Sequence, residues 1–398
     1  MFRKLFKAIQ LTADIFTSEL KAVFSDAGTV LMFMIALVAY PVLYSLGYEQ
    51  EIVRDVPVAV VDLDNSSLSR QCSRMADATE QLKVECKANS LKEAQNLFYT
   101  GKVKGVIVIP ANFEKDILRS KSTIVSVYSD ASYFLLYKQV FGGVVYSSGT
   151  LSAGVEIKRM INDGKTIDQA KDLQDPLKVD IYNLYNPFGG YCSFVMPGII
   201  ILILQQTLLI GIGILGGTSR ERNLFFTLHE YVNKKGGSIP AVFGKASSYV
   251  FIYIFNALFT MVVLHRWLGL PDNTNFLTTL VLLIPFLYSV SFLGLAISVF
   301  FKERVYPILF LVFLSPILLF ISGLSWPIQS VPRPIYLIGH LFPCTEMIPA
   351  YLRMRTAGAG LSQVTGEWMF ILIQMVIYFI IACVSYKLAM KNYKKGTV

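Results

Sequence analysis

The chain has 398 residues, of which 54% are hydrophobic and only 16% are charged. An ordinary soluble domain carries about 25% charged residues, so this composition excludes a purely soluble protein. The formal net charge of +9 could indicate nucleic-acid binding, but the basic residues lie beside long apolar runs, as the positive-inside rule expects of membrane proteins.

Residues 1–26 are predicted to form an amphipathic helix on the cytoplasmic membrane surface. Phe2, Ile9, Phe16 and Leu20 belong to a stripe of apolar residues spaced three or four apart, which is typical of one face of a helix. Such a helix lies flat in the membrane interface. The alternative is a plain cytoplasmic extension of the first span.

Six charge-free runs are long enough to cross a membrane, because a spanning helix needs about 20 mainly apolar residues. The predicted fold class is therefore a polytopic α-helical membrane protein with six transmembrane helices. An α/β extracytoplasmic domain is inserted between helices 1 and 2. The spans are predicted at 27–48, 189–217, 245–265, 274–301, 305–326 and 367–387.

The basic residues indicate that both termini are cytoplasmic. Lysine and arginine are concentrated before the first span, between the second and third spans, and in the tail 388–398. Positive residues favour the cytoplasmic side, which places the segment 49–188 outside. The first apolar run is longer than a signal-peptide core, so it is predicted to be a retained signal anchor.

Residues 49–188 have the pattern of a folded α/β domain. Four strands are predicted, at Pro57–Val61 and in "LKVECKA", "VKGVIVIP" and "STIVSVYSD". One intervening helix begins near Ser66, and another begins at Ser90, in a capping box with Glu93, and ends at Gly101. Strands that alternate with helices indicate α/β layers. Residues 131–174 are again helical in pattern.

Cysteine placement leaves the disulfide state open. Cys72 and Cys86 share the extracytoplasmic segment, where a disulfide is permitted, and the alternative is a pair of reduced or buried thiols. Cys192 and Cys344 are a second candidate pair near the outer membrane face. Connectivity cannot be deduced from sequence alone.

The sequence lacks the usual signatures of an enzyme. The histidines His229, His265 and His340 have no metal-ligand spacing with Cys, Asp or Glu. The only Gly-Lys-Thr, at 164–166, follows Arg159 where a phosphate-binding loop needs glycine. The chain is therefore expected to hold no catalytic residues, metal or cofactor, and any ATP and Mg²⁺ would be bound by another polypeptide.

Polar residues within the predicted spans are candidates for a substrate pathway or for hydrogen bonds between helices. None of these spans contains a buried acidic or basic residue in the prediction, which argues against an ion-driven transporter. The pathway candidates are Gln205, Gln206, Asn256, Ser315 and Phe320.

The segment 327–366 is too interrupted by proline to span and too apolar to be a free loop. Short re-entrant helices fit it, since backbone at membrane depth must be covered by protein or line a cavity. The residues expected to form a gate there are Trp326, Pro327, Pro343 and Glu346.

The cytoplasmic segment 218–244 begins with a charged run, "TSRERNLFFTLHE". A solvated loop would not need two phenylalanines beside arginines, whereas a helix end that docks into a partner would. The predicted contact residues are Arg220, Glu221, Arg222, Leu224, Phe225 and Phe226.

In this layout the chain resembles the ABC-2 permeases, also called type V ABC exporters, of the subgroup with a large periplasmic domain. The resemblance covers nearly the whole chain. It is carried by "VPVAVVDLDNSSLS", "LFYTGKVKGVIVIPANFEKDI", "VYSDAS", "LYNPFGGYCSFVMPGIIILILQQTLLIGIG" and "ISGLSWPIQSVPRPIYLIGHLFPCTEMIPAYLRMRTAG", in that order.

The resemblance implies the permease subunit of an ATP-driven exporter in a bacterial inner membrane. Two permeases, identical or sister subunits, would bind separate ATPase subunits through the run that begins at Arg220, with a periplasmic adaptor and an outer-membrane channel as further partners. The substrate would be hydrophobic or amphipathic, such as a drug or lipid. The family's coupling block has Gly-Thr after Arg-Glu, whereas "RNLFFTLHE" stands here. The alternative is a membrane-anchored sensor or scaffold whose outer domain binds a ligand or partner.

Overall fold

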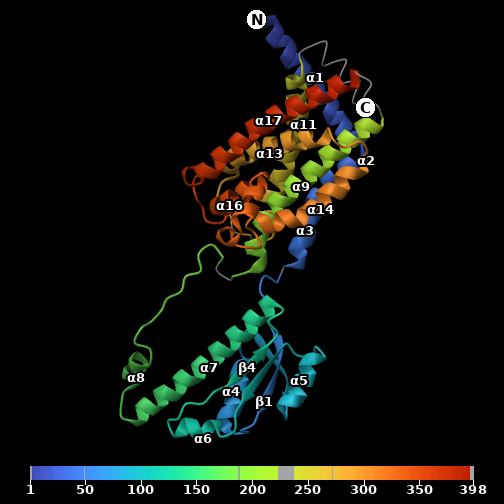
Figure 1. Ribbon diagram of the computed structural model, residues 1–398. Coiled ribbons are helices and arrows are strands. Elements are labelled where there is room, and N and C mark those ends of the chain that lie inside the picture. The colour runs from blue at the N-terminus through green and yellow to red at the C-terminus, as the bar shows by residue number, and fades with distance from the viewer. Residues whose placement is uncertain (1, 49, 187–188, 223–236, 271, 395–398) are drawn as a thin grey trace. The chain divides into compact units, whose positions relative to one another are not determined.

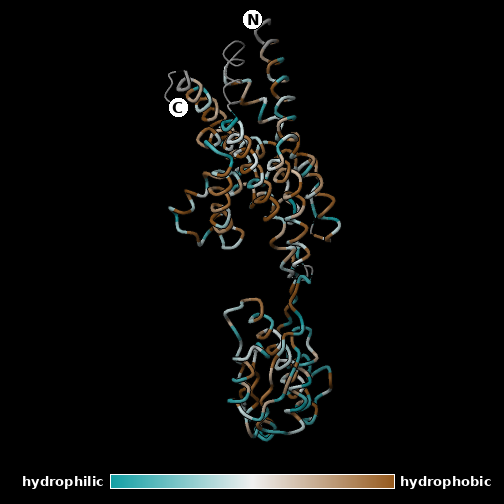
Figure 2. Tube along the Cα trace, turned by 90° about the vertical axis from the view of Figure 1, so that its right-hand side faces the viewer, coloured by the Kyte–Doolittle hydropathy of each residue, from teal (hydrophilic) through white to brown (hydrophobic). Residues whose placement is uncertain are grey.

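The computed structural model of the protein describes residues 2–48, 50–186, 189–222, 237–270 and 272–394. The chain forms two units (Figure 1). The helical unit comprises Met1–Glu51 and Asn183–Val398, and the α/β unit comprises Ile52–Tyr182. Hydrophobic residues run through the helices of the helical unit, whereas hydrophilic residues are frequent in the α/β unit (Figure 2).

The helical unit contains long helices and a group of short ones near the chain's last span. The long helices and their continuations are α1 (Phe2–Ser25), α2 (Ala27–Val30), η1 (Leu31–Ala36), α3 (Leu37–Gly47), α9 (Tyr191–Glu221), α11 (Ser238–Leu258), η2 (Phe259–Leu264), α12 (His265–Trp267), α13 (Phe276–Ser298), α14 (Val305–Ile321) and α17 (Thr365–Lys394). The short helices are η3 (Ile328–Ser330), α15 (Arg333–Gly339), α16 (Cys344–Arg355) and η4 (Leu361–Val364).

Within the described residues, five helical segments are long and apolar enough to cross a membrane, as expected of a polytopic membrane protein. They are Ala27–Gly47, Tyr191–Glu221, Ser238–Trp267, Phe276–Ser298 and Leu361–Met390. The span predicted at 305–326 corresponds to α14, whose 17 residues extend about 26 Å at 1.5 Å per residue. That length is slightly less than the hydrocarbon core of about 30 Å.

The third span begins earlier than predicted, and this corrects one sequence-based expectation. Helix α11 starts at Ser238 rather than at residue 245, so Lys245 lies within the helix. Its side chain is buried and ion-paired with Glu19 of α1. The expectation that no span carries a buried charge is therefore wrong, because Lys245 lies inside the helix and pairs with a residue of another helix.

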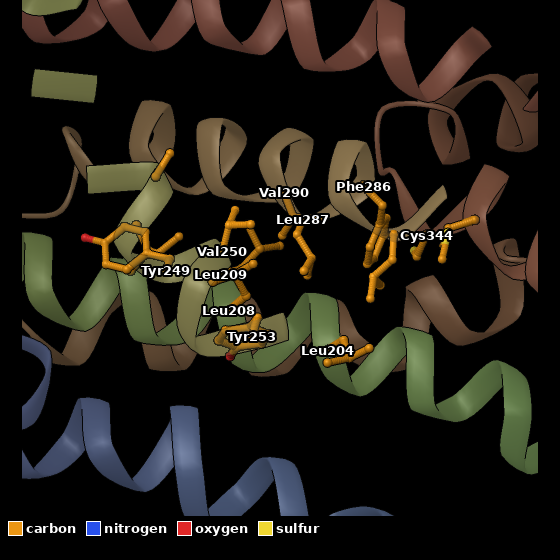
Figure 3. Close-up of a cluster of buried hydrophobic side chains, with 14 of the residues drawn as sticks. Leu204, Leu208, Leu209, Tyr249, Val250, Tyr253, Phe286, Leu287, Val290 and Cys344 are labelled. Atoms are coloured by element: carbon orange, nitrogen blue, oxygen red, sulfur yellow. The ribbon is translucent and has the colours of Figure 1, made fainter. Parts of the chain in front are cut away.

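Helix α9 is the central helix of the helical unit and is buried along most of its length. Leu204, Leu208 and Leu209 pack with side chains of α11 and α13 (Figure 3). Glycine allows the closest approaches, since a Cβ on Gly211 would stand 2.1 Å from the Phe33 ring. Burying one helix among its neighbours in this way makes α9 a stiff element.

The α/β unit is a four-stranded sheet of order β2-β1-β3-β4. Strand β1 (Val56–Asp62) pairs in parallel with β2 (Leu82–Ala88) and with β3 (Gly105–Ile109), and β4 (Ser126–Ser129) is antiparallel to β3. The four strands fall where the sequence predicts them. The helices are α4 (Ser67–Asp77), α5 (Leu91–Tyr99), α6 (Phe113–Leu118), α7 (Phe134–Asn162) and α8 (Ile167–Gln174).

Serine caps both predicted helix starts in this unit, but the capping box predicted at Ser90 is only half formed. The Ser66 hydroxyl accepts a bond from Ser69 N at 3.0 Å, and the Ser90 hydroxyl accepts one from Glu93 N at 3.2 Å. The Glu93 carboxylate accepts from Asn89 N rather than from Ser90 N. Gly101 has a φ of 74°, which suits a helix-ending glycine.

The sheet has a separate hydrophobic core on each face, and this explains why the Cys72–Cys86 bridge is absent. Cys72 lies in the core formed with α4 and α7, which includes Val58 and Val140. Cys86 packs on the other core, which includes Ala59 and Ala94. Both are free thiols, as are Cys192 and Cys344. Because the sheet separates the first pair, the side chains cannot meet.

Candidate functional site

The C-terminal end of α9 carries the start of the predicted coupling run. Helix α9 ends at Glu221, and Arg222 follows as its C-cap. The Arg220 guanidinium donates a hydrogen bond to the Val299 carbonyl at 2.7 Å, and the Glu221 carboxylate accepts one from Arg304 N at 2.7 Å. Arg220 and Glu221 thus hold α9 to the connection between α13 and α14. Leu224, Phe225 and Phe226 lie outside the described residues.

Close packing reinforces this contact. A Cβ on Gly217 would lie 2.6 Å from the backbone carbon and oxygen of Glu303, and one on Gly216 would lie 2.8 Å from Ser298 Cβ. Only glycine allows a helix and a neighbouring backbone to approach so closely. The last turn of α9 therefore rests directly on the connection between α13 and α14.

Asp26 joins this contact to the first span. Its carboxylate caps α2 by accepting from Thr29 N at 2.9 Å, and it accepts from the Thr218 hydroxyl of α9 at 3.4 Å. The Arg304 guanidinium lies 3.7 Å from the same carboxylate. We call Asp26, Thr218, Glu221 and Arg304 the inner joint, because these four residues connect α2, α9 and the α13–α14 connection.

A second polar contact ties α1 to α11. Lys245 Nζ lies 2.7 Å from Glu19 Oε2, and the Tyr249 hydroxyl donates to the same carboxylate. A Cβ on Gly244 would lie 2.8 Å from Thr12 O, so the two helices are also in close contact. Helix α1 is therefore packed on protein rather than only on a membrane surface.

The sequence missed the Glu19–Lys245 pair, although a signal was present. Leu11, Ile15 and Val23 are buried, and Glu19 continues their spacing of four. An acidic residue in a buried helical stripe predicts a cationic partner, because an unpaired buried charge is costly. Ile9, which belongs to the predicted apolar stripe, is exposed, as a side chain that faces lipid would be.

Of the predicted pathway residues, Gln205 makes structural bonds. Its Oε1 accepts from Cys344 N at 2.9 Å, and its Nε2 lies 3.1 Å from Cys344 Sγ. Gln205 thus satisfies the first backbone donor of α16, which has no partner within that helix. Gln206 differs, because it is buried and neither of its amide atoms has a hydrogen-bond partner among the residues the structure describes.

The other pathway candidates do not gather around these glutamines. Asn256 Nδ2 donates to Phe33 O of η1 at 2.8 Å. The Ser315 hydroxyl donates to Leu311 O within α14 at 3.0 Å, and Phe320 of the same helix is 62% exposed. The candidates therefore lie in separate surroundings. Among them, Gln206 is the residue whose amide atoms make no hydrogen bond with the described residues.

The predicted gate residues lie among the short helices, where two prolines begin helices. Pro327 precedes η3 and Pro343 precedes α16, while Trp326 is 58% exposed. Glu346 is buried, and its carboxylate lies against Nδ1 of the His340 ring. A polar link to α17 is supplied by Gln374, whose Nε2 donates to His340 O at 2.6 Å.

The far end of α16 is anchored by a buried arginine that sequence reasoning missed. Arg355 is only 1% exposed, and its guanidinium lies 2.8 Å from Asp272 Oδ2. It also donates to Met261 O and to Thr274 O. Helix α16 is thus bound to α9 at its start through Gln205 and to the α12–α13 connection at its end.

The described part of the chain contains no cluster of three or more His, Cys, Asp or Glu residues able to hold a metal ion. The arrangement of helices can instead transmit movement. Helix α9 connects two polar contacts, the inner joint at one end and the Gln205–Cys344 contact further along. Sixteen residues separate Gln205 from Glu221, which is about 24 Å of helix.

Comparison with known proteins agrees with this architecture. The chain is 24% identical over 262 residues to the probable multidrug ABC transporter permease YbhS of Escherichia coli K12, and equally to that of E. coli O157:H7. The alignment covers 65% of this chain and 66% of the relative, slightly less than two thirds of its length. The model of the ABC-2 family transporter proteins matches residues 27–384. With that match over most of its length, the chain belongs to the ABC-2 transporter family and is an integral membrane protein.

Proposed function

We propose that the chain is the permease subunit of an ATP-driven exporter that moves a hydrophobic or amphipathic molecule out of the cytoplasm or inner membrane. Family membership implies ABC ATPase partners and a permease dimer. The printed name of the E. coli relative, a probable multidrug permease, supports a drug-like substrate. Apolar pathway walls with few polar groups suit such molecules.

The observation that carries the mechanism is the inner joint. ATPase subunits docked on the segment that starts at Arg220 would push on the end of α9. Because Glu221 and Thr218 are bonded to Arg304 and Asp26, the push would reach α2 and α14 together. Movements that reposition several spans at once are what alternating access requires.

The same push would reach the outer half of the unit along α9. The helix is buried and closely packed, so a displacement of its inner end is transmitted rather than absorbed. Gln205 holds the start of α16, and α16 would shift with it. Opening between the short helices and α14 would then release substrate past Gln206.

The proposed topology has six spans, with α14 as the fifth, and places the α/β unit in the periplasm of a bacterial inner membrane. The basic residues that flank the spans support this orientation. In that setting an adaptor and an outer-membrane channel are expected partners. ATP and Mg²⁺ would be bound by the ATPase subunits, and this chain would hold no cofactor of its own.

Charge reversal at the coupling run tests the proposal. The double variant Arg220→Glu/Arg222→Glu should lose the co-purifying ATPase while remaining in the membrane. Arg222→Glu alone is a milder variant, since Arg222 is exposed and its change leaves the Arg220–Val299 bond intact. Lys87→Glu/Lys92→Glu, on exposed sites of the α/β unit, is the matched control. An ATPase retained by both coupling variants would refute the docking site.

A further inference from the structure

The α/β unit contains a groove that the transport mechanism does not use. Its volume is about 780 Å³, within the range of about 300–1,000 Å³ typical of small-molecule sites. One wall is the face of α7 from Val145 to Arg159, and the other is residues 120–125, between α6 and β4. All of its lining residues belong to the α/β unit.

The base and one end of the groove are apolar. Cys72, Phe113 and Leu151 line the base and are buried in the core beneath. Val145 and Ile124 line the walls and are 51% and 78% exposed. Two branched aliphatic side chains left open to water along a groove favour an apolar occupant, because covering them releases ordered water.

The opposite end is cationic. Arg159 Nη2 donates to Ile117 O, the carbonyl near the end of α6, at 3.2 Å, which fixes the guanidinium at the mouth and leaves its other donors available. Lys121 lies at the same end, because its backbone N bonds to Asp116 O of α6. Neither cation forms an ion pair with any residue of the described chain.

Glu156, one turn before Arg159, is the acidic residue of the lining, so the two cations outnumber it. Hydroxyl groups of Ser148 and Ser152 lie between the apolar and cationic ends. Val145 and Arg159 are fourteen residues apart, which is about 21 Å of helix. The groove therefore changes along its length from apolar to positively charged.

We propose that this groove binds a single-chain amphipathic anion, with its aliphatic chain over Val145, Ile124 and the base. Its carboxylate, sulfate or phosphate head lies at Lys121 and Arg159. The polarity of the groove determines the orientation, because the head forms charge-assisted hydrogen bonds only at one end. Binding needs neither ATP nor the ATPase, so it can be tested separately from transport.

Protection of a cysteine placed in the groove measures this binding. The full chain carrying Ser152→Cys is reconstituted in lipid nanodiscs and treated with N-ethylmaleimide, and the modified peptide is quantified by mass spectrometry. Dodecanoate is the probe, and dodecanol is its uncharged match. Lys92→Cys on α5, on the other face of the sheet, is the control position, since both replaced residues are exposed.

We expect dodecanoate to slow modification at Ser152→Cys by about fivefold or more at saturation, and to leave Lys92→Cys unchanged, because occupancy shields only the groove. Lys121→Gln should raise the half-protecting concentration about tenfold, the usual effect of losing one charge-assisted contact, and Lys121→Arg should restore it. Lys121 is suited to this test because its side chain makes no hydrogen bond within the described structure, so its replacement leaves the packing unchanged.

Results of three kinds would overturn the proposal. The first is no protection by dodecanoate, and the second is equal protection at both cysteine positions, which would indicate a general effect of the probe on the membrane. The third is equal protection by dodecanol, or protection unaffected by Lys121→Gln, either of which would show that no anion is recognised.

Discussion

The C-terminal end of α9 and its middle differ in how their polar groups are satisfied. At the inner end, Asp26, Thr218, Glu221 and Arg304 bond with one another across three elements. In the middle, Gln206 is buried with no partner for its amide among the described residues. An unsatisfied buried amide costs about 1–3 kcal/mol, whereas the polar groups of the joint have partners. The comparison separates a region whose polar groups are paired within the protein from one whose amide has no partner among the described residues.

The largest effect is expected at the buried pair beside the inner joint. Glu19→Ala should lower the free energy of unfolding by about 3–5 kcal/mol, since it leaves Lys245 as a buried charge without its carboxylate. Thermal unfolding of the purified protein in detergent measures the loss. Glu19→Met/Lys245→Met is the matched control and should recover most of it, because two apolar side chains replace both charges. A single variant as stable as the wild type would show that the pair is not buried.

A methyl group at Gly217 should have the next largest effect. Gly217→Ala places a Cβ 2.6 Å from the Glu303 backbone, which cannot move aside like a side-chain end. We expect a loss of about 1–3 kcal/mol in unfolding free energy, the usual cost of overpacking. Gly366→Ala, where no atom lies within 4 Å, is the control and should be neutral. Equal stability of the two variants would contradict the close contact between α9 and residues 303–304.

The two glutamines should respond differently to the same change. Gln205→Leu removes the partner of Cys344 N, so it should cost about 1–3 kcal/mol by leaving that donor unsatisfied. Gln206→Leu removes an amide without partners and should leave stability unchanged or raise it, while it impairs export. Thermal unfolding and substrate efflux, measured on both variants, test the contrast. Wild-type efflux in Gln206→Leu would make Gln206 a structural residue.

The smallest expected effect is a difference in reactivity between two thiols of the α/β unit, Cys72 and Cys86. Measuring it leaves the fold intact. Burial, with a contribution from Asp62, raises the pKa of Cys72. The reactive thiolate fraction therefore falls about tenfold for each pH unit below that pKa. With N-ethylmaleimide at neutral pH, Cys72 should react more slowly than the half-buried Cys86, and the rate should increase as pH rises. Failure of both to react before reduction would indicate a disulfide instead.

The sequence predicted local structure well wherever it depends on nearby residues. The strand around Val58 follows from a continuous apolar run and the strand around Val84 from alternation. The caps at Ser66 and Ser90 follow from turn chemistry, and all of these signals act over a few positions. It did not predict that α11 begins at Ser238, because Lys245 interrupts the apolar run. Lys245 can lie within the helix because its charge has a partner, Glu19. That partner is 226 residues away in the sequence.

The sequence identified polar residues of the candidate site, but it did not predict which residues they contact. Arg220 and Glu221 were singled out as partner-facing, yet both bond to the α13–α14 connection. Gln205 and Gln206 were given one role, although they point to different surroundings. Neighbouring residues on a helix differ by about 100° in direction, so their roles depend on which helices pack on each side. Composition does not contain that information.

The central claim is that the inner joint passes movement from the ATPases to the spans. The most direct test is the amount of substrate transported per ATP hydrolysed, in proteoliposomes that contain the permease and its ATPase. Arg304→Gln removes the ion pair with Asp26 and keeps the backbone N–H that Glu221 accepts. We expect the ATPase to remain bound and active while transport per ATP falls about tenfold, equivalent to about 1.4 kcal/mol of coupling. An unchanged ratio would contradict the account.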